Sequence, residues 1–316
     1  MLAAILGLAG ESLSADELAF FREARPAGFI LFGRNCRDRS QLRRLTDALR
    51  DVSGRGDVPI LIDQEGGRVA RLAPPEWPLF PAAGRFAALY DRAPISAIEA
   101  ARANAHAIAV TLVEAGINVN CAPVLDLRHQ GAHPVIGDRS FGGEPMRVAA
   151  LGRAVLDGLA AGGVCGVIKH IPGHGRANAD SHEVRPVVEA SAQELAADLA
   201  PFRALSDAAM AMTAHVRFAA WDQENCATQS ATVIGEVIRG EIGFDGLLLS
   251  DDLTMEALSG SLAERARTAL TAGCDLVLMG SGRLADNVAV AGAAADAGAA
   301  GRGPLGRAMG AVARKN

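Results

Sequence analysis

The stretch "GVIKHIPGHGRANADSH", residues 166–182, joins a short apolar run to a loop rich in histidine, glycine and charged residues. Residues 166–170 are too few for a helix but enough for a buried strand that ends at Lys169. Pro172 and the glycines at 173 and 175 oppose a helix after it. A buried strand that runs into a loop of titratable side chains is typical of parallel α/β proteins, whose chemistry lies at the carboxyl ends of the strands.

Seven further apolar runs repeat this pattern, at residues 3–10, 28–33, 58–63, 117–126, 209–216, 246–251 and 275–280. Each is apolar nearly throughout, as a parallel strand covered on both faces requires. The segments between them carry Ser-x-x-Glu capping boxes that begin helices, at Ser14/Glu17, Ser191/Glu194 and Ser261/Glu264. These strand–helix units predict an α/β fold of the (β/α)8 TIM-barrel class, because an open doubly wound sheet has fewer strands and a glycine-rich first turn.

Composition supports one large domain that spans residues 1–316. Half of the residues are hydrophobic and 21% are charged, and no linker divides the chain. The segment from about 285 to 316 is rich in Ala and Gly, and we predict no site residue there. The net charge of −5, without basic runs, argues against a nucleic-acid partner.

The cysteines and the first residues of the chain bear on its location. The five cysteines are scattered and show no C-x-x-C spacing, which predicts neither disulfides nor a zinc site and favours a reducing cytoplasm. The start "MLAAILGLAGESLS" lacks a basic region and is interpreted as a strand rather than a signal peptide. Because no apolar run reaches the roughly 20 residues that a bilayer needs, we expect a cytoplasmic protein without a membrane span.

The loops that leave the predicted strands carry the candidate site residues. Asp63 ends one strand and precedes Arg68 and Arg71, so it can accept hydrogen bonds from sugar or polyol hydroxyls beside cationic donors. Arg139, on the loop after residues 117–126, suggests an anionic or carbonyl-bearing group of a substrate. His215 is better explained by a hydrogen-bonded place in the core.

Titratable groups also follow the later strands. Lys169 and His170 would donate hydrogen bonds into the barrel mouth, and residues 175–182 would form a flap. On the flap, Asp180 is placed to orient His182 as an acid/base. In the "SDD" run, Asp251 and Asp252 point in alternate directions, so one should face the mouth as a nucleophile or general base while the other braces the loop.

The four-residue spacing of His170 and His174 could suggest the paired ligands of a helical metal site. Pro172 and the neighbouring glycines oppose that helix, and Lys169 would repel a cation. We therefore predict no metal and no other cofactor.

Several of these stretches together resemble a known family. The motifs are "GFILFGRN", "IDQEGGRV", "CAPVLD", "VIGDRSFG", "KHIPGHG" followed by "DSH", "MTAHV", "GFDGLLLSDDLTM" and "AGCDLVL". In this order, between about residues 5 and 280, they are similar to glycoside hydrolase family 3, and within it to the single-domain bacterial β-N-acetylglucosaminidases. The second domain that family 3 β-glucosidases carry would not fit in this chain, which favours the hexosaminidase branch.

The resemblance implies a role for each candidate. Asp251 would be the nucleophile of a retaining enzyme that forms a covalent glycosyl intermediate, and Asp252 would be structural. His182 paired with Asp180 would replace the usual carboxylic acid/base. The residues that would hold the N-acetylglucosamine ring are Asp63, Arg71, Arg139, Lys169 and His170, whereas Arg68 has no counterpart.

The resemblance also implies the activity. The chain would remove terminal N-acetylglucosamine from peptidoglycan (anhydro-muropeptide) fragments during cell-wall recycling, with a sugar as its partner and neither nucleic acid nor membrane. Two alternatives stay open: a phosphorylase that transfers the sugar to phosphate, and a barrel that binds sugars without cleaving them. No pattern indicates an oligomeric state.

Overall fold

The computed structural model describes residues 1–295 and 302–313, and its centre is a closed barrel of parallel strands. Around the barrel the strands follow the order β1-β12-β11-β9-β7-β6-β3-β2. Their bounds are Leu2–Gly7 (β1), Pro26–Leu31 (β2), Ile60–Ile62 (β3), Val119–Asn120 (β6), Cys165–Ile171 (β7), Met210–Thr213 (β9), Leu247–Asp252 (β11) and Leu276–Met279 (β12). Each overlaps an apolar run predicted to be a strand, so the (β/α)8 barrel is confirmed.

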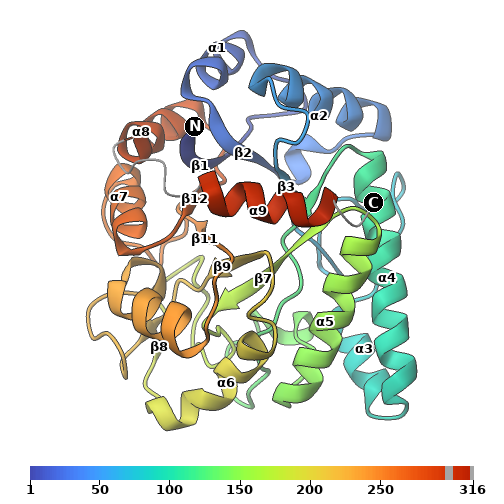
Figure 1. The fold of residues 1–316 in the computed structure, drawn as a ribbon, viewed down its shortest axis with the longest axis vertical. Coiled ribbons are helices and arrows are strands. Elements are labelled where there is room, and N and C mark those ends of the chain that lie inside the picture. The colour runs from blue at the N-terminus through green and yellow to red at the C-terminus, as the bar shows by residue number, and fades with distance from the viewer. Residues whose placement is uncertain (296–301, 314–316) are drawn as a thin grey trace.

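Helices connect the strands and surround the barrel (Figure 1). They are α1 (Ala15–Ala24), α2 (Arg39–Ser53), α3 (Ala83–Tyr90), α4 (Pro94–Glu114), α5 (Pro145–Ala161), α6 (Ala192–Ala204), a π-helix (Val233–Glu241), α7 (Leu262–Ala272) and α8 (Leu284–Ala295). The three predicted capping boxes are confirmed at the starts of α1, α6 and α7. None of the helices in the described part of the chain is long and apolar enough to cross a membrane.

The apolar strands serve two cores, one inside the barrel and one outside it. In β1, Ala3 and Ile5 belong to the cluster that fills the barrel, whereas Leu2, Ala4 and Leu6 pack against the surrounding helices. Both faces of each strand are therefore buried, which is why the runs are continuous rather than alternating. All five cysteines are free, and four of them are buried.

Helix α9 (Arg302–Ala313) closes the amino-terminal end of the barrel, and Figure 1 shows it lying across the strands. Leu305 and Ala308 are buried in the cluster that fills the barrel interior. Met1 and Ala209, which precede β1 and β9, pack against the same cluster. The Ala/Gly-rich segment from about residue 285 to 316 thus includes a helix that closes one end of the barrel. Predictions for residues 296–301 and 314–316 lie outside the described residues.

Strand β6 is shorter than the predicted run at residues 117–126. Regular pairing ends at Asn120, and the segment after it contains Pro123, which has no N–H to donate to a neighbouring strand. Pairing resumes beyond it, because Val124 forms a bridge with Lys169 and the Leu125 amide donates to the Lys169 carbonyl. The run still follows the barrel wall and delivers Asp126 to the carboxyl-terminal end.

Two short ribbons lie outside the barrel. Strands β4 (Gln64–Gly66) and β5 (Val69–Ala70) form an antiparallel pair directly after β3, and β8 (Val187–Val188) pairs with β10 (Arg217–Phe218) in parallel. These strands could not be predicted from the sequence, because a strand of two or three residues has no detectable hydrophobic periodicity.

Candidate active site

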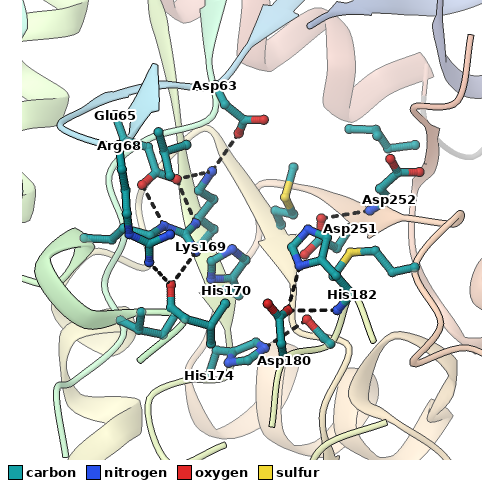
Figure 2. A pocket seen from close by; sticks show the side chains of 18 of the residues that line it. Asp63, Glu65, Arg68, Lys169, His170, His174, Asp180, His182, Asp251 and Asp252 are labelled. Carbon is teal, nitrogen blue, oxygen red and sulfur yellow. Dashed lines mark hydrogen bonds and ion pairs between the residues drawn. The ribbon is translucent and has the colours of Figure 1, made fainter. Parts of the chain in front are cut away.

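A cavity of about 310 Å³ opens at the carboxyl-terminal ends of the strands, and the close view in Figure 2 shows the side chains around it. All of the predicted site residues line it: Asp63, Arg71, Arg139, Lys169, His170, Asp180, His182 and Asp251. Five further polar residues also line it: Glu65, Arg68, His174, Ser181 and Asp252. The barrel thus brings together polar side chains that are up to 189 residues apart in sequence, from Asp63 to Asp252.

Lys169, on β7, lies nearly buried between two carboxylates. Its ammonium Nζ is 2.8 Å from Asp63 Oδ1 and 2.7 Å from Glu65 Oε1. Arg71 Nη2 donates to the other oxygen of Asp63, at 3.0 Å. Burial by itself would raise the pKa of the Asp63 carboxyl, but the two cations outweigh it and hold that pKa below its usual range. Asp63 is therefore ionised and fixed by two donors.

Glu65 joins this cluster and was missed by the sequence analysis. Arg139 donates to it from Nε at 2.9 Å and from Nη2 at 2.8 Å, a bidentate pair that is almost fully buried. Burial would lower the pKa of Lys169, but the carboxylates of Asp63 and Glu65 outweigh it and raise that pKa. Glu65 lies two residues after Asp63, and this spacing was the signal that could have identified it.

The hairpin formed by β4 and β5 places Glu65 at the cavity. The buried Gln64 side chain accepts hydrogen bonds from the Arg71 and Leu72 amides and donates to the Leu72 carbonyl. Gly66 has a φ of +96°, and a Cβ there would lie 2.3 Å from the Pro81 carbonyl oxygen. Only glycine fits this tight turn, which directs the Glu65 carboxylate toward Lys169.

His170 is oriented by Asp126, a second residue that the sequence analysis missed. The His170 Nδ1 lies 2.6 Å from Asp126 Oδ2, and Asp126 Oδ1 accepts from the backbone amides of His170 and His174 at 3.2 and 2.7 Å. Burial would raise the pKa of Asp126, but the His170 imidazole outweighs it and lowers that pKa. An ionised carboxylate only accepts, so Nδ1 carries the proton and Nε2 is the nitrogen left for other contacts.

Asp251 and Asp252, at the end of β11, have different surroundings. The Asp252 Oδ1 accepts from the amides of Thr254 and Gly280, both at 3.0 Å, and so braces the loop. Within the described structure, Asp251 Oδ1 accepts only from the Asp252 amide, at 2.8 Å. Burial would raise the pKa of Asp251, but His215 and His170 outweigh it and lower that pKa, whereas burial raises the pKa of Asp252. Both carboxylates line the cavity, but that of Asp252 is held by two amides beyond the strand, whereas that of Asp251 accepts from the neighbouring amide alone among the described residues.

The flap, residues 175–182, carries the predicted acid/base pair. Asp180 Oδ1 is 2.7 Å from His182 Nδ1 and accepts from the His182 amide at 2.9 Å. Burial would raise the pKa of Asp180, but the amide and the imidazole of His182 outweigh it and lower that pKa. The His182 side chain is 67% exposed, so its Nε2 can exchange protons with solvent or substrate. Figure 2 shows His182 and Asp251 on one side of the cavity and Lys169 on the other.

Between the members of this pair, Ser181 attaches the flap to the barrel. Its side chain is buried, and its Oγ lies 3.1 Å from Nε2 of the buried His174. Its carbonyl accepts from the Ala257 amide, on the loop after β11, at 3.1 Å. The positions of Asp180 and His182 therefore depend on contacts made by the residue between them.

His215 and Arg68 each have partners of their own in the described structure. His215 is fully buried, with Nδ1 2.7 Å from Thr228 Oγ1 and Nε2 3.0 Å from the Asp252 carbonyl oxygen, so its predicted core role is confirmed. Arg68 lies at the cavity rim, half exposed, and pairs with Asp138 at 3.4 Å while it donates to the Val135 carbonyl.

His170 and His174 do not form a helical pair of metal ligands. Their rings meet edge to face with centroids 5.6 Å apart, and Asp126 binds both residues through its carboxylate. Among the residues with a described structure, no group of three or more His, Cys, Asp or Glu side chains could hold a metal ion.

A closed (β/α)8 barrel whose mouth combines a cation–carboxylate cluster, a buried aspartate and an exposed Asp–His pair has the construction of a glycoside hydrolase. Comparison with known proteins agrees. The sequence profile described as "Glycosyl hydrolase family 3 N terminal domain" matches residues 9–307. The chain belongs to glycosyl hydrolase family 3.

Curated relatives and solved structures are similar to the chain over most of its length. A "Beta-hexosaminidase" of Alkalilimnicola ehrlichii is 42% identical over 280 residues, which cover 87% of this chain and 79% of that protein. The structure of NagZ from Neisseria gonorrhoeae is 32% identical with a TM-score of 0.82 and covers 99% of this chain and 97% of that one. A family 3 β-N-acetylglucosaminidase from Paenibacillus is 34% identical with a TM-score of 0.87, but this chain spans only 60% of its length.

Proposed function

We propose that this chain is a retaining exo-β-N-acetylglucosaminidase with Asp251 as nucleophile and His182 as acid/base. The observation that carries the proposal is that Asp251 lines the same cavity as the exposed Asp180–His182 pair. The surroundings of Asp251 keep its carboxylate ionised, and no backbone group of the loop uses its second oxygen. A retaining glycosidase needs these two groups on either side of the scissile bond.

The reaction has two steps. Asp251 attacks the anomeric carbon while the bond to the aglycone oxygen breaks, and His182 gives that oxygen its Nε2 proton. Water then attacks the anomeric carbon and releases Asp251, and His182 takes the proton of the water. The ionised Asp180 favours the Nδ1–H tautomer of His182, so the second nitrogen performs both transfers.

The cation–carboxylate cluster would hold the sugar. Its members in this role are Asp63, Arg71, Arg139, Lys169 and His170. Lys169, Arg71 and Arg139 are each paired with a carboxylate, so the cluster suits the hydroxyl and acetamido groups of a neutral sugar.

We also propose that the substrate is a terminal N-acetylglucosamine of peptidoglycan fragments, cleaved in the cytoplasm during cell-wall recycling. The support is the family, the hexosaminidase names of the relatives, and the solved complex of the Neisseria gonorrhoeae NagZ with N-trifluoroacetyl-D-glucosamine.

Hydrolysis of p-nitrophenyl β-N-acetylglucosaminide tests the proposal, with the β-glucoside as the contrasting substrate. We expect wild type and the exposed control variant Asp245→Ala to cleave the first, with Asp251→Ala inactive. Azide should then restore turnover of Asp251→Ala and give the α-glycosyl azide, because it replaces the missing nucleophile. Wild type that binds the sugar without turnover, with or without phosphate, would instead indicate a sugar-binding barrel.

A further inference from the structure

A second, open cavity of about 560 Å³ lies beside the first. Its wall is the loop that follows β6, from Arg128 to Gly137, together with Gly175 of the flap. None of the proposed sugar-binding residues lines it. It is therefore a separate space at the mouth of the barrel.

The two cavities are neighbours. Ile136 lines both of them. The His133 amide donates to the Ala177 carbonyl at 3.0 Å, which joins the loop to the flap. Because the flap also carries His182, the second cavity lies on the side where the leaving oxygen would receive its proton. A group linked to that oxygen would extend toward it.

The second cavity differs from the first in charge. The first is lined by five acidic side chains: Asp63, Glu65, Asp180, Asp251 and Asp252. The second, among the described residues, is lined by none. Instead it has Arg128, which is exposed and whose guanidinium has no hydrogen-bond or ion-pair partner in the described part of the chain.

Two imidazoles add hydrogen-bond donors. His133 Nδ1 accepts from the Val135 amide at 3.2 Å, so Nε2 is the nitrogen that bears a proton. His129 Nε2 lies 2.6 Å from the buried Asp198, whose other oxygen accepts from Arg176 at 2.7 Å. The His129–Asp198 pair therefore forms a fixed part of the cavity wall. The side chains of Arg128 and His133 are available to contact a ligand.

We propose that this second cavity binds the aglycone, and that it selects an aglycone bearing a carboxylate, which Arg128 pairs with. The inference rests on the proposed glycosidase function and specifies the substrate of that site. A guanidinium without an acceptor, beside an imidazole N–H donor and with no acid among the described residues that line the cavity, suits a carboxylate. Because the pair would be exposed, its effect is modest and weakens with salt.

The test compares N-acetylglucosaminyl-β-1,4-N-acetylmuramic acid, which has a free lactyl carboxylate, with its lactyl amide. In wild type we expect kcat/KM to be about fivefold higher for the acid than for the amide, and this ratio should shrink in 0.5 M NaCl. In Arg128→Gln the ratio should fall to near one, and in Arg128→Lys it should be largely retained. The control Arg22→Gln, on α1, removes an exposed arginine far from both cavities and should keep the wild-type ratio.

Equal rates for acid and amide in wild type, or an unchanged ratio in Arg128→Gln, would overturn the inference. Failure to cleave either disaccharide while the p-nitrophenyl glycoside is cleaved would also overturn it and leave the proposed β-N-acetylglucosaminidase activity standing. If wild type cleaves nothing, the proposed function fails, and the affinities of Asp251→Asn for the acid and the amide, measured by calorimetry, still decide whether the cavity prefers the carboxylate.

Discussion

The imidazole of His174 lies 3.1 Å from the Ser181 hydroxyl, inside the protein and directly beneath the Asp180–His182 pair. Burial, together with the neighbouring His170, lowers the pKa of His174 to about 4. The ring is therefore neutral near pH 7, and the contact is an ordinary hydrogen bond between uncharged groups. It is the only hydrogen bond that a side chain of residues 180–182 makes to a residue outside the flap within the described structure.

His174 is accordingly expected to act as a positioning residue for the flap. Ser181→Ala and His174→Phe both remove the bond, and each should lower kcat by about tenfold, which corresponds to one neutral hydrogen bond. Since both changes break the same contact, the double variant should be little worse than the poorer single one. The measurement is a double-mutant cycle on kcat; effects that simply multiply would show that the two residues act independently.

Asp126→Asn tests whether the orientation of His170 matters. An asparagine keeps the shape but offers one carbonyl oxygen where the aspartate accepts three hydrogen bonds, from His170 Nδ1 and from two amides. Loss of charge-assisted bonds should lower kcat/KM by about 10- to 100-fold. Steady-state kinetics with the p-nitrophenyl substrate measures this, with Asp245→Asn as an exposed control. Full activity in Asp126→Asn would mean that His170 needs no such anchor.

Much of the fold was predictable because each strand is buried on both faces. Every residue of β1 is apolar or glycine, and such runs separated by capped helices have few alternatives to a barrel. The position of a side chain at a strand's carboxyl end then predicts that it reaches the mouth. Lys169 and Asp251 could therefore be placed in one cavity without any knowledge of their contacts.

The missed residues depend on partners that are distant in the chain. Glu65 binds Arg139, 74 positions away, and Asp126 binds His170, 44 positions away. The two-residue spacing from Asp63 could have indicated that Glu65 reaches the cavity, but no local pattern identifies the distant partner of either acid. Helix α9 was missed for a different reason: its buried Leu305 and Ala308 lie in an Ala/Gly-rich sequence with little apolar contrast.

Glu65→Gln should damage both stability and sugar binding. The change leaves Arg139 and Lys169 buried with one carboxylate fewer, and breaking such a buried pair costs about 3 kcal/mol. Lys169 and Arg139 would also lose the contact that fixes their positions, so KM should rise more than kcat falls. Urea unfolding and steady-state kinetics measure the two effects.

Arg68→Gln is the control, because it breaks a half-exposed pair with Asp138 and should lower the free energy of unfolding by less than about 1 kcal/mol. Equal losses of stability for the two variants would contradict the importance of burial.

The cluster around Lys169 also makes stability depend on pH. The pKa of the folded Asp63 carboxyl is lowered, so as pH falls below about 4 the unfolded chain takes up a proton that the folded chain does not. The stabilisation from Asp63 is thus fully present above that pH and is lost as pH falls toward the folded pKa. Asp63→Asn should cost about 3 kcal/mol at pH 7, and this difference from wild type should narrow at pH 3. Urea unfolding at several pH values measures it. Asp47→Asn, which breaks an exposed pair with Arg43, is the control and should differ little from wild type throughout. A difference for Asp63→Asn that stays constant down to pH 3 would mean that its carboxylate is not stabilised by Lys169 and Arg71.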